Sequence, residues 1–251
     1  FDVPSPSELP ARLDAVLEVL YLVFNEGHGA TRGPALVRPE LVHDALRLGE
    51  LLLERPELDL PRVHALLALM YLQGARLGAR TSAAGELTPL AEQDRSRWNT
   101  EWIARGLGHF EHSMAGNELT AFHVEASIAC VHARAASYAE TDWAEILARY
   151  DLLLVLADTP VVRLNRAVAL SKVHGLAAGL AEVERAGKDG ALDEYVLWHA
   201  TRARMAWALG RSDQALASFD AALALQASEP ELAHLRLLRE RCARGEASAV
   251  F

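Results

Sequence analysis

The sequence contains little cysteine, little lysine and no long hydrophobic run. Its two cysteines, Cys130 and Cys242, lie far apart within helical patterns, which argues against a disulfide framework and favours the reducing cytoplasm. No apolar run approaches the ~18 residues that a membrane-spanning helix needs. Among the 25 basic residues, only Lys172 and Lys188 are lysines. The sequence therefore predicts a cytoplasmic chain without a membrane segment.

Basic surface is also scarce. The formal net charge is -9, and no stretch rich in Lys or Arg stands out. Because phosphate backbones bind to concentrated basic surfaces, we expect no direct nucleic-acid contact. The 251 residues are enough for one large domain or two modest ones. The opening segment FDVPSPSELP lacks an initiator Met and a signal peptide, which predicts a piece of a longer polypeptide.

Known catalytic and metal-binding motifs are missing as well. The sequence has no His-Glu-x-x-His, no glycine-rich phosphate loop and no Gly-x-Ser-x-Gly. His109 and His112 share one helical face, but further ligands do not follow at a recognisable spacing. We therefore expect no metal, no cofactor and no catalytic residue, so the chain is predicted not to be an enzyme.

What the chain does contain is helical periodicity. Between Leu13 and Phe24 apolar residues recur at i, i+3, i+4 and i+7, and Val19 and Leu22 make the opposite face apolar too. This pattern predicts a helix that is buried nearly all round. Gly27 can adopt the left-handed conformation that closes a helix, so we expect the helix to end there.

Helix signals dominate the remaining sequence. Prolines at 39 and 61 sit at helix starts, and Asp142 is a natural N-cap with Glu145 three residues later. A helical pattern resumes at Glu92 and continues through Trp98. The segment RTSAAGELTPL is the one candidate for a small hairpin. The predicted fold class is all-α: an antiparallel helical array followed by helix-turn-helix repeats, with at most one small β-hairpin.

The last ninety residues resemble tetratricopeptide (TPR) repeats. The turn glycines Gly175 and Gly210 are 35 residues apart, and the TPR period is about 34. A helix from Pro230 to Cys242 would cover the last apolar face. We therefore predict a helical domain over residues 1–156 and a TPR-like region over residues 157–251.

Two polar clusters are candidate sites. The first would form a polar pocket or an interdomain contact, although the same residues could simply tie helix ends together. The second would line the concave groove of the repeats, where such arrays bind peptides, although its aromatic members could be packing residues. The first cluster comprises Asn25, Glu26, Asp94, Arg95, Arg97 and Trp98, and the second comprises Asn165, Arg166, Tyr195 and Trp198.

Four segments in this order resemble the C-terminal extension of a group of bacterial extracytoplasmic-function sigma factors. They are LDAVLEVLYLVFNEGHGA, ALLALMYLQGARLGARTSAAGELTPLAEQDRSRWN, TDWAEILARYDLLL and PVVRLNRAVAL. The resemblance covers essentially the whole chain. The family has Tyr where this chain has His28, and HDARR where it has QGARL, Gln73 to Leu77.

The resemblance implies a regulatory module that modulates its own sigma domains and RNA polymerase. Possible partners are those N-terminal sigma domains, the polymerase or a separate regulatory protein. Two other functions are open from the residues alone. One is a free-standing TPR-type adaptor. The other is a helical domain that binds or converts a small ligand, with Glu26, Asp94, Arg95 and Arg97 in its polar wall.

Overall fold

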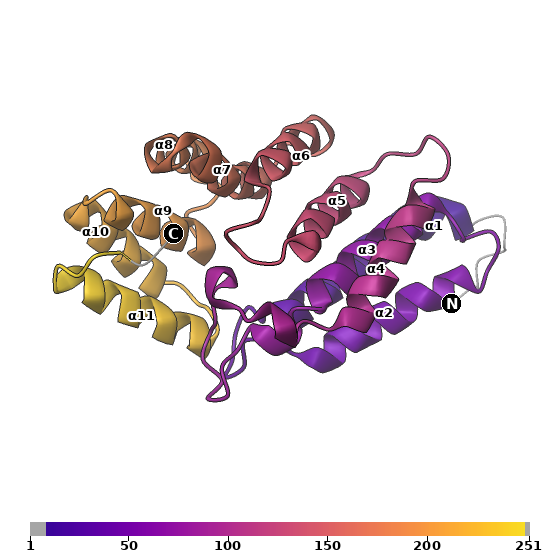
Figure 1. Cartoon of the computed structure of the whole chain (residues 1–251), viewed down its shortest axis with the longest axis horizontal. Coiled ribbons are helices and arrows are strands. Elements are labelled where there is room, and N and C mark those ends of the chain that lie inside the picture. The colour runs from indigo at the N-terminus through magenta and orange to yellow at the C-terminus, as the bar shows by residue number, and fades with distance from the viewer. Residues whose placement is uncertain (1–8, 249–251) are drawn as a thin grey trace. The chain divides into compact units, whose positions relative to one another are not determined.

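The computed structural model describes residues 9–248, and its regular structure is helical, as the sequence predicted (Figure 1). Two compact units are distinguished. The N-terminal unit takes the chain up to Ala30, Val37–Arg80 and Asp94–Ser137, and the C-terminal unit takes Thr31–Leu36, Thr81–Gln93 and the chain from Tyr138. Within residues 9–248, no helix combines the length and apolar character needed to span a bilayer.

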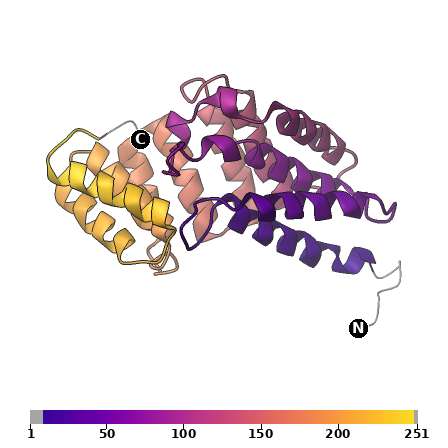
Figure 2. The same cartoon turned by 90° about the horizontal axis from the view of Figure 1, so that it is seen from below.

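The N-terminal unit is built around one central helix. It contains α1 (Leu9–His28), α2 (Pro39–Leu53), α3 (Pro61–Gly74), α4 (Thr100–Ser113) and α5 (Ala121–Arg134), which lie side by side in Figures 1 and 2. Helix α3 packs against all four others. Ten of its fourteen residues are buried, including every residue from Ala65 to Leu72. The core of this unit therefore surrounds α3 on every side.

Helix α1 differs from its prediction in two ways. Its buried stripe is Leu13, Leu17, Leu20 and Phe24, whereas Val19 is 57% exposed and Leu22 is 67% exposed. The expectation of all-round burial was therefore wrong. The prediction that Gly27 ends the helix was also wrong, because α1 continues to His28 and Gly27 is not among the glycines with positive φ.

Gly27 instead permits a close helix contact. A Cβ atom at this position would lie 2.8 Å from Val42 Cγ2 and 2.9 Å from Leu41 Cβ, too close for carbon atoms. Helix α2 can approach α1 this closely only because residue 27 has no side chain. Just beyond this point the Arg38 N–H donates to the Gly27 carbonyl at 2.7 Å.

The segment around QDRSRW is also less regular than expected. The predicted helix from Glu92 is replaced by two 3-10 turns, η3 (Leu90–Glu92) and η4 (Arg95–Arg97), before α4 begins at Thr100. A third short turn, η2 (Leu77–Ala79), follows α3. Asp94 and Asn99 each accept a hydrogen bond from a backbone N–H two or three residues later. These two caps stop one regular helix from running through the segment.

The C-terminal unit is a stack of consecutive helices. It contains α6 (Trp143–Leu156), α7 (Pro160–His174), α8 (Leu176–Ala186), α9 (Val196–Ala208), α10 (Ser212–Leu223) and α11 (Glu229–Ala243). Each helix packs against the next. The predicted cap is confirmed, since Asp142 accepts from the Glu145 N–H at 2.8 Å. The predicted turn glycines are confirmed too, since Gly175 and Gly210 have φ of 90° and 74°.

The boundary between the compact units lies at Ser137–Tyr138, whereas the sequence placed it after residue 156. Helix α6 packs against α7 as one more member of the stack, so it belongs with the C-terminal unit. Two segments from earlier in the chain also join the C-terminal unit. The Glu229 N–H donates to the Gly33 carbonyl at 2.9 Å, and Thr81 and Leu87 form one antiparallel bridge in place of a full hairpin.

Replacing Gly27 by alanine should destabilise the N-terminal unit by about 1–3 kcal/mol, because the added methyl group would force α1 and α2 apart. The matched control is Gly108→Ala in α4, where a Cβ meets nothing within 4 Å. That change should stabilise the protein by about 0.5–1 kcal/mol, since alanine favours the helix. Urea unfolding of both variants measures the difference. Equal effects at the two positions would contradict the close-contact role.

Candidate functional site

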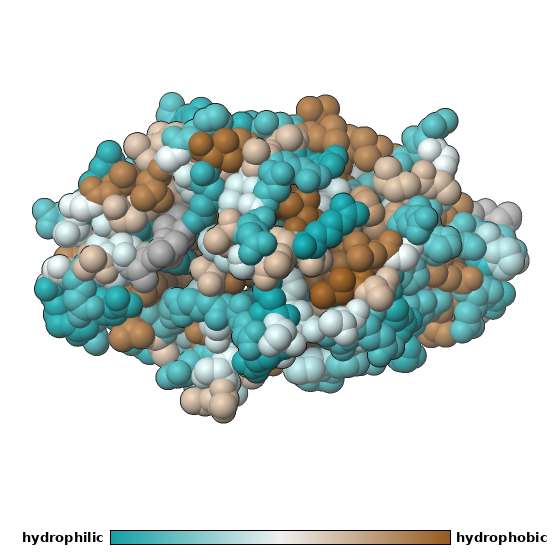
Figure 3. Space-filling model, viewed as in Figure 1, coloured by the Kyte–Doolittle hydropathy of each residue, from teal (hydrophilic) through white to brown (hydrophobic). Residues whose placement is uncertain are grey.

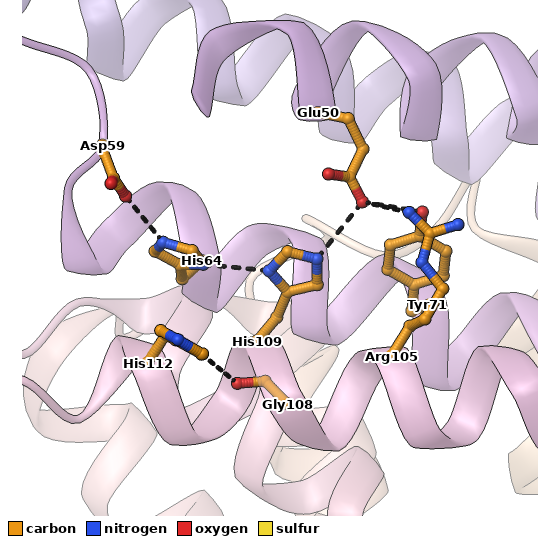
Figure 4. A network of polar contacts seen from close by, with 8 residues as sticks. All are labelled: Glu50, Asp59, His64, Tyr71, Arg105, Gly108, His109 and His112. Carbon is orange, nitrogen blue, oxygen red and sulfur yellow. Dashed lines mark hydrogen bonds and ion pairs between the residues drawn. The ribbon is translucent and has the colours of Figure 1, made fainter. Parts of the chain in front are cut away.

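A row of polar side chains crosses the N-terminal unit from the α2–α3 loop to α2 (Figure 4). His64 of α3 contacts Asp59 through Nε2 at 2.8 Å and His109 of α4 through Nδ1 at 2.9 Å. The other ring nitrogen of His109 lies 3.2 Å from Glu50 Oε1. Three helices and the α2–α3 loop therefore meet through two imidazoles held between two carboxylates.

Glu50 is the most heavily hydrogen-bonded member of this row. Its Oε1 accepts from the Tyr71 hydroxyl at 2.8 Å and from Arg105 Nη2 at 2.7 Å, in addition to its His109 contact. The Arg105 guanidinium also lies over the Tyr71 ring, 4.5 Å from its centre. Burial alone raises the pKa of Glu50, but the Tyr71 and His109 contacts and the Arg105 charge outweigh it and lower this pKa overall.

The neighbouring groups respond to the same carboxylate. Burial, followed by the hydrogen bond to Glu50, raises the pKa of Tyr71, so the phenol stays protonated and donates. Burial lowers the pKa of His109, although Glu50 partly offsets this effect. A neutral His109 that donates to Glu50 leaves its Nδ1 free to accept from His64.

Proton counting sets what this row can do chemically. Two neutral imidazoles carry two N–H protons, whereas the row contains three contacts that each require one. One additional proton on the His64–His109 pair would complete all three hydrogen bonds. With both imidazoles neutral, the row is therefore one N–H short of satisfying its three contacts.

The histidines do not assemble a metal site. His112 directs its Nδ1 to the Gly108 carbonyl at 2.7 Å, and its ring stacks on His64 at 5.2 Å. Across the part of the chain that the structure describes, no group of three or more His, Cys, Asp or Glu side chains could hold a metal ion.

The polar residues of the first predicted cluster bind separate structural partners. Glu26 pairs with Arg38 at 3.3 Å, and the backbone carbonyl of Asn25 accepts from the Gly29 N–H at 2.9 Å. Asp94 caps η4 through the Ser96 N–H at 2.9 Å. These contacts match the alternative in which such residues tie helix ends together.

Arg95, Arg97 and Trp98 complete this cluster. Arg95 donates to the carbonyls of His132 and Ala135 at the end of α5, and Arg97 donates to the Gly78 carbonyl. Trp98 is 4% exposed, and the Arg95 guanidinium stacks over its ring at 4.6 Å. The sequence marked this segment as difficult to assign to the surface, but Asp94, Ser96, Arg97 and Asn99 are exposed, and only Gln93 and Trp98 are buried.

In the second predicted cluster Arg166 has a structural role. It pairs with Asp151 of α6 at 2.6 Å and lies 3.8 Å from Glu182 of α8, so it joins three consecutive helices. Trp198 is buried and donates to the Val183 carbonyl at 2.8 Å. Asn165 is exposed, and Tyr195 is half-buried at the N-cap of α9.

Sequence reasoning missed a third cluster, which we call the arginine cluster. It surrounds Arg76, which follows α3, and its other members come from α1, α5, the residue after η2, and η4 with the residue after it. No local pattern marks it, although five of its six members lie in segments that carry the family resemblance. The arginine cluster comprises His28, Arg76, Arg80, Arg95, Trp98 and His132.

Comparisons with known proteins leave the function open. A family of unknown function, DUF6596, matches residues 12–114, which cover α1 to α4. An uncharacterized protein of Rhizobium meliloti (strain 1021) is 39% identical over 237 residues. The alignment spans 94% of this chain but 55% of that relative, so the chain is similar to about half of a longer protein. No solved structure matches the chain.

Replacing Glu50 by glutamine should destabilise the protein by about 1–2 kcal/mol at pH 7, a range that allows for the partial exposure of this side chain. Because folding lowers the pKa of Glu50, its stabilisation is present above the ordinary carboxyl pKa and is lost as the pH falls through the lowered value. The difference from wild type should therefore shrink towards pH 3.

Urea unfolding at pH 7 and pH 3 provides the measurement. Glu18→Gln, on the exposed side of α1, is the matched control and should change stability by less than about 0.5 kcal/mol. A Glu50→Gln effect that is the same at both pH values would contradict a charged Glu50 at the centre of the row.

Proposed function

We propose that this chain is the regulatory, protein-interaction module of an extracytoplasmic-function sigma factor, and that it modulates the sigma domains of its own polypeptide and RNA polymerase in the cytoplasm. The observation that carries the proposal is the match to 55% of a longer relative, which leaves almost half of that protein for further domains. The sigma-factor identity itself rests on the four segments that resemble such extensions.

The surface of each unit supports a role in protein binding. In the N-terminal unit, Val16, Val19 and Leu22 form an exposed apolar stripe along α1. In the C-terminal unit, Leu152, Val155 and Leu156 are exposed on α6, where hydrophobic atoms gather in Figure 3. Contiguous apolar side chains at a surface commonly mark interaction sites.

The electrostatics support a protein partner over nucleic acid. A net charge of -9 disfavours binding to DNA but suits a basic protein surface. Regulation by such a module requires different affinities for two states of the sigma domains. A difference of a few kcal/mol is enough to shift their populations substantially.

The test measures binding between this chain and the sigma domains of a full-length protein that contains it. Val19→Asp and Val155→Asp introduce a charge into each stripe, at side chains that are 57% and 80% exposed, so both variants should fold. We expect one of them to weaken binding at least about tenfold, which corresponds to the loss of about 1.4 kcal/mol.

Leu237→Asp, at a 51% exposed position on α11, is the matched control and should bind like wild type. Titration at several salt concentrations separates a charge-driven contact from an apolar one. Absence of binding to the sigma domains and to RNA polymerase would overturn the proposal. An encoded full-length protein that lacks sigma domains would instead favour a free-standing TPR-type adaptor.

A further inference from the structure

The arginine cluster concentrates positive charge inside the N-terminal unit. Arg76 is its centre, and the charges that act on Arg76 are those of Arg80 and Arg95. Both neighbours are positive and therefore repel it. Burial is the largest influence on Arg76, and together with these two charges it lowers the pKa of the guanidinium to about 9.

The Arg76 guanidinium lacks a polar partner within residues 9–248. None of the hydrogen bonds or ion pairs of these residues involves it, and its Nε is fully buried. Its contact is with the Trp98 ring, whose centre is 5.8 Å away. The indole Nε1 of Trp98 is itself buried without a hydrogen-bond partner. Two adjacent side chains thus hold buried N–H donors that the described residues do not satisfy.

The two histidines of the arginine cluster are kept neutral. Burial, followed by the charges of Arg80 and Arg76, lowers the pKa of His28 well below its ordinary value. Burial, followed by Arg76 and Arg95, lowers the pKa of His132 to about 3. Neutral imidazoles add polar atoms to the arginine cluster without adding further positive charge.

Arg76 is half-buried and its Nε is fully buried, and a guanidinium held in this way beside like charges is costly unless an anion accompanies it. Phosphate suits such a place because arginine donates to it with two parallel N–H bonds. An indole N–H can supply a further donor to another phosphate oxygen. We propose that Arg76 and Trp98, surrounded by the other members of the arginine cluster, bind a phosphate group.

This site is independent of the proposed sigma-factor role, because it depends only on contacts within the N-terminal unit. The phosphate site therefore needs no residue of the C-terminal unit. Inorganic phosphate is the simplest probe, since it carries the bound group without the remainder of a larger ligand. Acetate serves as the carboxylate counterpart.

The experiment compares thermal unfolding of the whole chain in phosphate, acetate and chloride at matched ionic strength. A ligand at about 100 times its Kd should raise the Tm of a protein of this size by about 5 °C or more. We expect this rise in phosphate and not in acetate. Calorimetric titration with phosphate should show one site.

Arg76→Met removes the charge while keeping much of the side-chain volume, and it should abolish the rise in Tm. Arg12→Met removes an equal charge from an exposed position on α1 and should keep the full response. Arg76→Lys retains the charge but not the paired donors, so it should bind at least about tenfold more weakly. Arg76→Lys keeps the test valid if Arg76→Met does not fold.

Three outcomes would overturn the proposal. The first is a wild-type Tm that is no higher in phosphate than in chloride. The second is an equal response of the Arg12 and Arg76 variants, which would show that general screening is responsible. The third is stabilisation by acetate as large as that by phosphate, which would assign the arginine cluster to a carboxylate.

Discussion

The burial of α3, ten of whose fourteen residues are buried, is the constraint on which the N-terminal unit depends. Because α1, α2, α4 and α5 surround this helix, little of its surface reaches water, so its buried polar groups need partners in the neighbouring segments. His64 and Tyr71 obey this rule, and their partners are Asp59, His109 and Glu50. The polar row of Figure 4 is thus a direct consequence of placing a histidine and a tyrosine on the central helix.

Two electrostatic environments follow from the same helix. Along α3 the polar row is centred on a carboxylate that collects donors from a tyrosine, an arginine and a histidine. Just beyond the end of α3, the centre is Arg76, and its charged neighbours have the same sign. In the first environment, each donor to Glu50 finds its acceptor within the unit. The second contains donors that the described residues leave unsatisfied, which is why it has the character of a binding site.

The fold was largely predictable from the sequence, because apolar spacing, proline starts and capping residues act within a few positions of one another. The Asp142 cap and the turn glycines Gly175 and Gly210 are examples. Gly27 was misassigned because its role depends on α2, which no local pattern reveals. The sites were less predictable for the same reason. Asp94 and Arg166 stood out but serve structural contacts, whereas Glu50 and Arg76 acquire their chemistry from residues brought together only by folding.

The division of the chain has a further consequence for how the molecule is made and degraded. The backbone passes between the compact units at Ala30–Thr31, Leu36–Val37, Arg80–Thr81, Gln93–Asp94 and Ser137–Tyr138. Because each unit is made of several separate chain segments, a single protease cut at any of these places does not divide the chain into the two complete units. Gly33, whose carbonyl holds the start of α11, emerges from the ribosome long before its partner. The contact between Gly33 and Glu229 therefore forms only after the ribosome has made the chain beyond residue 229.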